Sequence, residues 1–235
     1  MLIRDIVGLP GKSKQIIVAK YREKCLWLRC IKNIPVIIYD KNNKNAKHHL
    51  PNIPVFEARK FGGIGHKKTP TGRESHTYLY HIIKNYDSLP DMVVFLQGSP
   101  FEVHSNSLDA LRVLVERDFE GVTFQPLNFP LVISNKKGAP THRGLPIERV
   151  FKRLFKSECP SYFAYTWGAM FCASKEVIHR KPVAFYEEMM QVIYDEPVSG
   201  YVYERLWPTV LGCDKFEIHD SYSIKDRASW ELPNL

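Results

Sequence analysis

The sequence lacks any apolar run close to the ~20 residues that a membrane-spanning helix needs. The apolar run at its amino terminus is also too short for a signal peptide. Its five cysteines form no close Cys-x-x-Cys pair, which argues against both a disulfide framework and a structural zinc site. These absences predict a cytoplasmic protein without a membrane span. They also predict free, buried thiols at Cys25, Cys30 and Cys172, which stand among apolar residues.

The sequence also carries no zinc knuckle, helix-turn-helix or RNP-like aromatic pattern, so nucleic acid is not an expected partner. The net charge is +8, from 33 Lys and Arg against 25 Asp and Glu. This balance suits anionic ligands, but it also serves solubility, and the basic residues are scattered. Gly11 to Ser13 resemble the end of a phosphate-binding loop. Ile6 stands where that loop requires a glycine, so no such loop is predicted.

Short apolar runs alternate with helical repeats along the chain, which predicts an α/β fold. Strands are expected over 15–19, 35–39, 54–58, 92–96, 121–124 and 167–173. Helices are expected over 23–31, 73–86, 105–117, 147–155, 174–179, 182–194 and from 201 until Pro208. The alternation predicts a largely parallel sheet with helices on both faces. One domain is expected over residues 1–235, with a core over 15–212 and a peripheral carboxyl-terminal segment over 213–235.

The most informative stretch runs from Thr71 to His104. Thr71 and Glu74 match the S/T-x-x-E capping box, and the repeat after them predicts a helix that ends at the turn over 87–91. Met92–Leu96 is a continuous apolar run, which predicts a strand covered on both faces. Ligands of open α/β sheets bind at the carboxyl ends of the strands. The helix start and the strand end are therefore two pieces of one candidate site.

Arg73 lies in the first turn of this predicted helix, where a cation is unfavourable against the helix dipole. A bound pyrophosphate would compensate, because free amides and the guanidinium would both face it. The alternative is that Glu74 only caps the helix. At the strand end, Gln97, Gly98 and Ser99 either contact a ligand or form an ordinary turn.

Glu204 stands among aromatic and apolar residues in the segment YVYERLWP. A carboxylate in such surroundings is either a general base with a raised pKa or the partner of a cation. Arg205 and Arg149 are the candidate partners, so the sequence leaves both roles open.

Trp167, followed by Gly168, is expected to open a strand and either stacks on a sugar or base or packs in the core. Glu102 and His104 are the candidate metal ligands just after the central strand. Two ligands fall short of the cluster that a metal site needs, so no metal site is predicted.

Four segments carry a family resemblance: IIVAKYRE, TGRESHTYLYHIIKNYDSLPDMVVFLQGSPFEVH, WGAMFCASKEVIHRKPVAFYEE and YERLWPTVLG. Over most of its length the chain resembles an uncharacterised family of fungal, algal and viral proteins with the signature GRExxTYLxxII…YDxLPDxxVFLQG. That family is similar to GT-A-type glycosyltransferases.

The resemblance implies a GT-A-like, Rossmann-like fold, with a mixed, mostly parallel sheet flanked by helices. It implies an enzyme that moves a sugar from a nucleotide-sugar donor to the hydroxyl of a glycan or another acceptor. The first two strands would hold the nucleotide at their ends. The donor-binding residues implied there are Ala19, Tyr21, Tyr39 and Asp40, with Glu23 completing the motif of the first strand.

The central strand of a GT-A enzyme delivers an Asp-x-Asp that binds manganese or magnesium together with the sugar diphosphate. This chain has Gln97 and Gly98 there instead, and the motif is absent. Two routes follow from the resemblance. Either Arg73 and nearby lysines neutralise the diphosphate without a metal, or Glu102 and His104 substitute as metal ligands.

The resemblance places Glu204 where a GT-A enzyme carries the base that deprotonates the acceptor, with Glu187 and Glu188 as further candidates. The residues expected in the sugar and acceptor pocket are His104, Trp167 and Gly168. The missing Asp-x-Asp keeps open an alternative, a non-catalytic GT-A-like module that binds a glycan or nucleotide. A hydrolase or phosphatase is a third interpretation.

Overall fold

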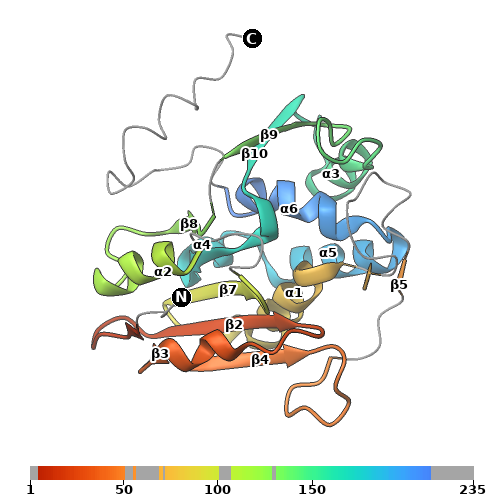
Figure 1. Ribbon diagram of the computed structural model, residues 1–235. Helices are drawn as coiled ribbons and strands as arrows, with labels where there is room; N and C mark the ends of the chain where they lie inside the picture. Colours follow the sequence, from red (N-terminus) through yellow and green to blue (C-terminus); the bar gives the residue numbers. More distant parts are fainter. Residues whose placement is uncertain are drawn as a thin grey trace.

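The computed structural model describes residues 5–50, 55–56, 69–70, 72–100, 107–128 and 131–212. Figure 1 colours the elements along the sequence, from red at the amino terminus to blue at the carboxyl terminus. They are β1 (Ile6–Val7), β2 (Lys14–Lys20), the 3-10 helix η1 (Leu26–Cys30), β3 (Ile31–Lys32), β4 (Val36–Asp40), β5 (Val55–Phe56), β6 (Thr69–Pro70), α1 (Arg73–Asn85), η3 (Tyr86–Ser88), β7 (Met92–Gln97), α2 (Ser107–Glu116), β8 (Phe124–Pro126), β9 (Val132–Asn135), α3 (Ile147–Phe155), β10 (Tyr162–Tyr165), η4 (Trp167–Ala169), β11 (Phe171–Ser174), α4 (Lys175–His179), α5 (Val183–Asp195) and α6 (Ser199–Val210).

A five-stranded sheet with the strand order β4-β2-β7-β11-β8 forms the centre. Strands β4, β2 and β7 pair in parallel, whereas β11 runs antiparallel to both of its neighbours. Four of the five strands therefore point the same way, and the expected mixed α/β sheet is confirmed. Because β11 is reversed, its amino end lies at the same edge as the carboxyl ends of β2, β4 and β7.

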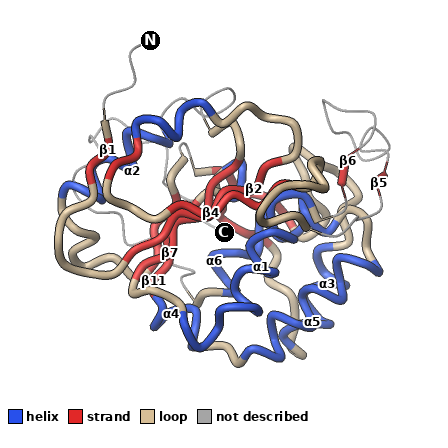
Figure 2. The backbone as a smooth tube through the Cα atoms, turned by 90° about the horizontal axis from the view of Figure 1, so that it is seen from below, coloured by secondary structure: helices blue, strands red, loops and turns tan. Residues whose placement is uncertain are grey.

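Side chains of the central strand β7 alternate between two apolar cores, as the pleat of a strand requires. Val93 and Phe95 join the core that contains α1, α3, α5 and α6. Val94 and Leu96 join the core that contains α2 and η1. Figure 2 shows the sheet between α2 on one side and α1, α5 and α6 on the other. The strand is buried on both faces, as its unbroken apolar run predicts.

Strands β9 and β10 form a separate antiparallel pair, in which Tyr165 lies opposite Val132 and Tyr162 opposite Asn135. The pair packs on α6 and is visible beside α3 in Figure 1. The sequence analysis assigned no strand to either segment. The strand expected over 54–58 is shorter as well, and β5 pairs with β6 rather than with the central sheet.

Three expected elements differ in detail. The helix expected over 23–31 is only the short η1, in which Leu26 is 57% exposed. The strand expected from Trp167 begins only at Phe171, because η4 occupies the preceding residues. Helix α6 continues past Pro208, whose ring removes one backbone donor. Trp207 and the residues around it are almost fully buried, so their packing compensates for the lost hydrogen bond.

Cys25, Cys30 and Cys172 are free and buried, and burial raises the pKa of Cys172 to about 12. The longest described helices, α1 and α5, have 13 residues each. No helix in the described part of the chain is long and apolar enough to cross a membrane.

Candidate functional site

Three of the predicted site residues meet at the carboxyl edge of the sheet. Gln97, at the end of β7, donates its side-chain N–H to the carbonyl of Gly168 over 2.8 Å. The backbone N–H of Gly168 donates to Oε1 of Glu204 over 2.5 Å. The reversed direction of β11 causes this meeting, because η4 precedes β11 and so reaches the end of β7. Residues from β7, η4 and α6 thus converge although they are far apart in the sequence.

Gly168 can serve both neighbours because of its backbone conformation. Its φ is +88°, a left-handed value that glycine adopts without the steric cost that a Cβ would bring. Ala169 follows with φ +49°, so the chain turns sharply before β11 begins. The turn points the N–H of Gly168 at Glu204 and its carbonyl at Gln97. The apolar run predicts a strand here, so the turn is not apparent from the sequence.

Glu204 occupies a half-buried position on α6, with its side chain 16% exposed. Burial raises the pKa of this carboxyl above its ordinary value, although Arg205, Arg73 and the N–H of Gly168 act in the opposite direction. Nη1 of Arg205 lies 3.5 Å from Oε2 of Glu204. The ion pair with Arg205 is therefore present. The alternative partner Arg149 instead binds Glu196, so that expectation is wrong.

Arg73 begins α1 in an unusual backbone conformation. Its φ is +46° and that of the preceding Gly72 is +73°, so two successive residues are left-handed before the helix begins. A non-glycine residue in this region costs about 1–3 kcal/mol, and such strain clusters at functional sites. Gly72 is the N-cap residue of α1, whereas the expected capping box requires Thr71 in that position. Thr71 itself lies outside the described residues.

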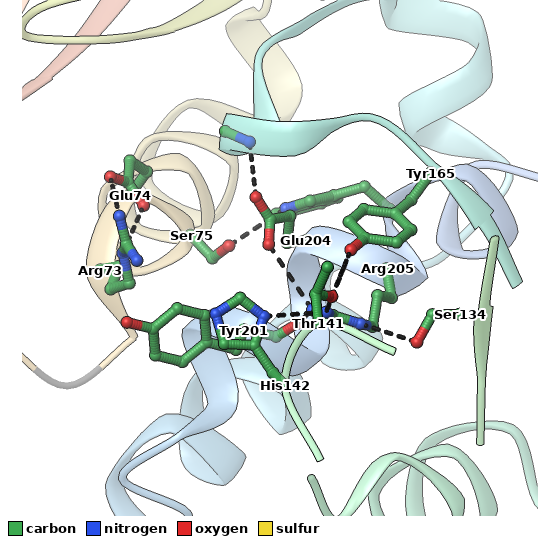
Figure 3. Close-up of polar contacts among 12 residues, drawn as sticks. Arg73, Glu74, Ser75, Ser134, Thr141, His142, Tyr165, Tyr201, Glu204 and Arg205 are labelled. Carbon is green, nitrogen blue, oxygen red and sulfur yellow. Dashed lines mark hydrogen bonds and ion pairs between the residues drawn. The ribbon is translucent and has the colours of Figure 1, made fainter. Parts of the chain in front are cut away.

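The guanidinium of Arg73 is held between an acid and an aromatic ring. Its Nε lies 3.3 Å from Oε2 of Glu74, and its central carbon lies 4.9 Å from the centre of the Tyr201 ring. Glu74 is the main cause of the raised pKa of Arg73, and Glu204 contributes to the same shift. The charges of Arg73 and Glu204 therefore influence each other across the site. Figure 3 shows Arg73 bound to Glu74 at one side of the cluster.

Lys41 is a member of the site that the sequence analysis did not single out. It follows β4, and its Nζ donates to the backbone carbonyl of Arg73. Burial lowers its pKa to about 7, while the charges of Glu74 and Glu23 oppose this shift and that of Arg73 adds to it. The only sequence signal for Lys41 is its position directly after a parallel strand, where ligand-binding residues gather.

Glu23 fills the space beside the end of β7. Its Oε2 accepts hydrogen bonds from the backbone N–H groups of Tyr21, over 2.7 Å, and Arg22, over 3.0 Å. A Cβ on Gly98 would lie 2.7 Å from that same oxygen, so the position admits only glycine. The carbonyl of Gly98 in turn accepts from the indole N–H of Trp27 over 2.8 Å. Gly98 thus allows the close approach of two chain segments.

Arg205 ties α6 to the β9–β10 pair and is fully buried. Its Nε donates to Ser134 over 3.0 Å, and its Nη2 donates to Tyr165 over 3.1 Å and to Thr141 over 2.9 Å. Figure 3 shows these bonds radiating from one guanidinium. The sequence indicates Arg205 only as a partner of Glu204 and gives no sign of this network.

Several implied donor residues lie elsewhere. Tyr39 is buried in the core, where its hydroxyl pairs with Nδ1 of His81 over 3.1 Å, so it is not available to a nucleotide. Asp40 binds Lys20 and the N–H groups of Asn42 and Asn43, and these contacts, against its burial, hold the pKa of Asp40 below its ordinary value. Both residues have structural roles.

The remaining candidates divide between the site and the rest of the molecule. Ala19 is buried at the end of β2, whereas Trp167 is 45% exposed directly beside Gly168 and is not a core residue. Glu188 pairs with Arg153 on α3, and Glu187 is exposed on α5. Glu102 and His104 lie outside the described residues.

The described residues do not offer a metal centre. The end of β7 presents an amide that is already bound to Gly168 rather than an acid. Over the described ranges, no group of three or more His, Cys, Asp or Glu side chains could hold a metal ion.

Comparisons with known proteins place the chain in a family. Neither a curated protein nor a solved structure matches the chain. The family described as "Protein of unknown function (DUF3431)" matches residues 16–223, which is most of the chain, and the protein belongs to that family.

Proposed function

We propose that this protein is a glycosyltransferase that moves a sugar from a nucleotide-sugar donor to a hydroxyl acceptor. The observation that carries the proposal is the half-buried carboxylate of Glu204, placed at the carboxyl edge of the sheet with cations close by. The mixed sheet and the helix that precedes its central strand agree with the GT-A-like resemblance of the sequence. The transferase activity, the nucleotide-sugar donor and the hydroxyl acceptor are all proposed.

Glu204 would act as the general base. Its raised pKa lies closer to neutral pH than that of an ordinary carboxyl. A general base is most effective when its pKa is near the working pH. It takes the proton of the acceptor hydroxyl, whose oxygen attacks the anomeric carbon of the donor sugar. The bond between that carbon and the diphosphate oxygen breaks, and its electron pair leaves with the diphosphate. A positioned base of this kind contributes roughly 10²–10⁴-fold to the rate.

Arg73 and Lys41 would stabilise the negative charge on the leaving diphosphate. Arg73 is at the start of α1, where backbone N–H groups without helical partners favour an anion. Lys41 is bonded to the carbonyl of Arg73, so the two cations are held together. Charge that develops on the leaving group is best stabilised by such prearranged cations and amides.

Trp167 would form the wall of the sugar pocket. Its indole is 45% exposed although it adjoins the buried Gly168. Exposed aromatic rings beside a polar site suit stacking on the apolar face of a sugar ring. Its backbone carbonyl accepts from Asn128 over 3.0 Å, which fixes the chain on which the indole is mounted.

The test is release of nucleoside diphosphate from a panel of nucleotide sugars, compared between wild type and Glu204→Gln. The amide keeps an acceptor for the N–H of Gly168 but cannot take a proton. We expect the rate to fall by about 10²-fold or more. Glu187→Gln is the matched control, because Glu187 is exposed on α5 and should be dispensable. A Glu204→Gln protein as active as wild type would refute the assignment.

A second candidate is a non-catalytic module that binds a glycan or nucleotide. It is favoured by the end of β7, where Gln97 holds Gly168 and no acid is present. Thermal-shift measurements separate the two functions, because a binder gains stability with nucleotides yet turns over no donor. Absence of stabilisation by every nucleotide and nucleotide sugar at millimolar concentration would contradict both.

A further inference from the structure

We propose that His142 is a second ligand-binding residue of this site, which donates a hydrogen bond from Nε2 to an oxygen of the diphosphate, and that Arg205 is the positioning residue that fixes it. This inference rests on the proposed function, because it names how the diphosphate of the same donor is held. His142 was not among the residues that the sequence or the family resemblance indicated.

The network around Arg205 decides which ring nitrogen of His142 carries the hydrogen. Nη2 of Arg205 lies 3.0 Å from Nδ1 of His142. A guanidinium has only donors, so Nδ1 must be the acceptor in this bond. The hydrogen of the neutral imidazole is therefore on Nε2. The two hydrogens of Nη2 are shared among Nδ1 of His142, Thr141 and Tyr165, while Nη1 binds the carbonyl of Tyr201 over 2.6 Å and Nε binds Ser134.

His142 is neutral at physiological pH. Burial is the main cause that lowers its pKa, to about 4, and the positive charges of Arg205 and Arg73 lower it further. Protonation would also place a second hydrogen on Nδ1, against the N–H of Arg205. The ring therefore supplies a fixed hydrogen-bond donor rather than a second positive charge.

The position of the ring directs this donor into the site. The imidazole packs against Tyr201, with 4.5 Å between the ring centres, and Arg73 lies over the same tyrosine. Figure 3 shows the ring edge opposite Nδ1 turned toward the side on which Arg73 lies. Among the described residues Nε2 has no hydrogen-bond partner. Arg73 and His142 thus present donors from α1 and from the β9–α3 connection to one place.

A phosphate oxygen is the ligand group that fits this pair. It accepts several hydrogen bonds at once, and it gains from the charge of Arg73. Glu204 is already engaged by Gly168 and Arg205 on the other side of the cluster, so the ligand oxygen need not compete with the base.

The experiment is calorimetric titration of nucleoside diphosphates, without sugar, into the full chain and two variants. His142→Asn keeps an acceptor near the position of Nδ1 but removes the donor at Nε2. His142→Gln places an amide N–H near the position of Nε2. We expect His142→Asn to weaken binding about tenfold or more and His142→Gln to restore most of the affinity. Thermal unfolding of each variant shows whether it is folded.

A second readout addresses Arg205 directly. The ¹⁵N spectrum of the His142 ring should show an unprotonated Nδ1 and a protonated Nε2 in the free protein, and added nucleoside diphosphate should shift the Nε2–H signal. A hydrogen on Nδ1 would overturn the positioning role. Wild-type binding that His142→Asn leaves unchanged would overturn the inference and leave the proposed function standing. If wild type binds no nucleoside diphosphate, the proposed function fails and this inference falls with it.

Discussion

Two histidines of α1 should make the fold sensitive to mild acid. His76 is 1% exposed and His81 is fully buried. Burial lowers the pKa of His76 from 6.5 to about 3 and that of His81 from 6.5 to about 4. Among the residues that the structure describes, the buried Nδ1 of His76 and the buried Nε2 of His81 have no hydrogen-bond partner. A protonated ring would therefore place an uncompensated charge in the helix that carries Arg73.

The size of the effect follows from the difference between the folded and unfolded pKa values. As the pH falls below 6.5, the unfolded chain binds protons at both rings, whereas the folded chain stays neutral down to about pH 4 at His81 and pH 3 at His76. Stability from these groups is complete above pH 6.5 and is lost as the pH falls. At pH 5 the loss is about 2 kcal/mol for each histidine. Together they remove a large share of the ~5–15 kcal/mol by which a domain is stable.

The assay is urea unfolding at pH 7.5 and at pH 5, followed by circular dichroism, for wild type and His76→Gln. The variant cannot titrate at position 76, so its loss of stability between the two pH values should be about 2 kcal/mol smaller than that of wild type. Glu204, whose raised pKa acts in the opposite direction, and Lys41 are present in both proteins, so their contributions cancel. The exposed His179, whose Nε2 pairs with the carbonyl of Tyr86 over 2.8 Å, is replaced by Gln to report the cost of removing a surface histidine.

An equal loss of stability in wild type and His76→Gln would refute this reasoning. It would mean that the folded chain protonates His76 as readily as the unfolded chain does. The packing of His76 against the Tyr194 ring, with 6.3 Å between ring centres, would then have to open at pH 5 without unfolding α1.

Two other substitutions test the arrangement around Arg73. Because burial lowers the pKa of Lys41 to about 7, a bound nucleoside diphosphate should draw a proton onto it at pH 8. Calorimetry in buffers of different ionisation enthalpy should detect this proton uptake in wild type. Proton uptake that persists in Lys41→Met would contradict the inference that Lys41 is the group that takes up the proton. A Cβ on Gly200 would lie 3.0 Å from the backbone carbonyl carbon of Gly72 and from Cβ of Arg73. Gly200→Ala should therefore lower the free energy of unfolding by about 1–3 kcal/mol in urea titrations, and an unchanged or higher value would show that α6 and α1 are less tightly packed than described.

The central elements were predictable because their burial is encoded locally. Strand β7 is buried on both faces. Its five consecutive apolar residues predict this burial even when the neighbouring elements are unknown. Helix α3 begins and ends where its apolar repeat predicts, at Ile147 and Phe155. Arg73, Gln97 and Glu204 could be selected as site residues because each stands at the end of such an element or among apolar neighbours.

Partners from distant segments could not be predicted in the same way. Tyr78 and His81 are polar residues of α1, yet both are fully buried in the core. The hydroxyl of Tyr39 pairs with the ring of His81 and so lowers the cost of burying that ring. The two residues are far apart in the sequence, which gives no indication of the contact. The pairing of Arg205 with His142 depends on β9 and β10, four-residue strands among Pro and Gly residues that carry no strong periodicity.

The end of β7 shows why the departure from an Asp-x-Asp pattern is required by this site's own geometry. The side chain of Gln97 meets the carbonyl of Gly168, which can only accept a hydrogen bond. An aspartate or glutamate at position 97 would place a second acceptor against that carbonyl and repel it. The amide instead donates, and it holds the turn of η4 in the orientation that points the N–H of Gly168 at Glu204. Gln97 therefore positions the carboxylate of Glu204 through the backbone of Gly168. We expect Gln97→Glu to release Glu204 from the N–H of Gly168, even though the added acid resembles the residue found in metal-dependent transferases.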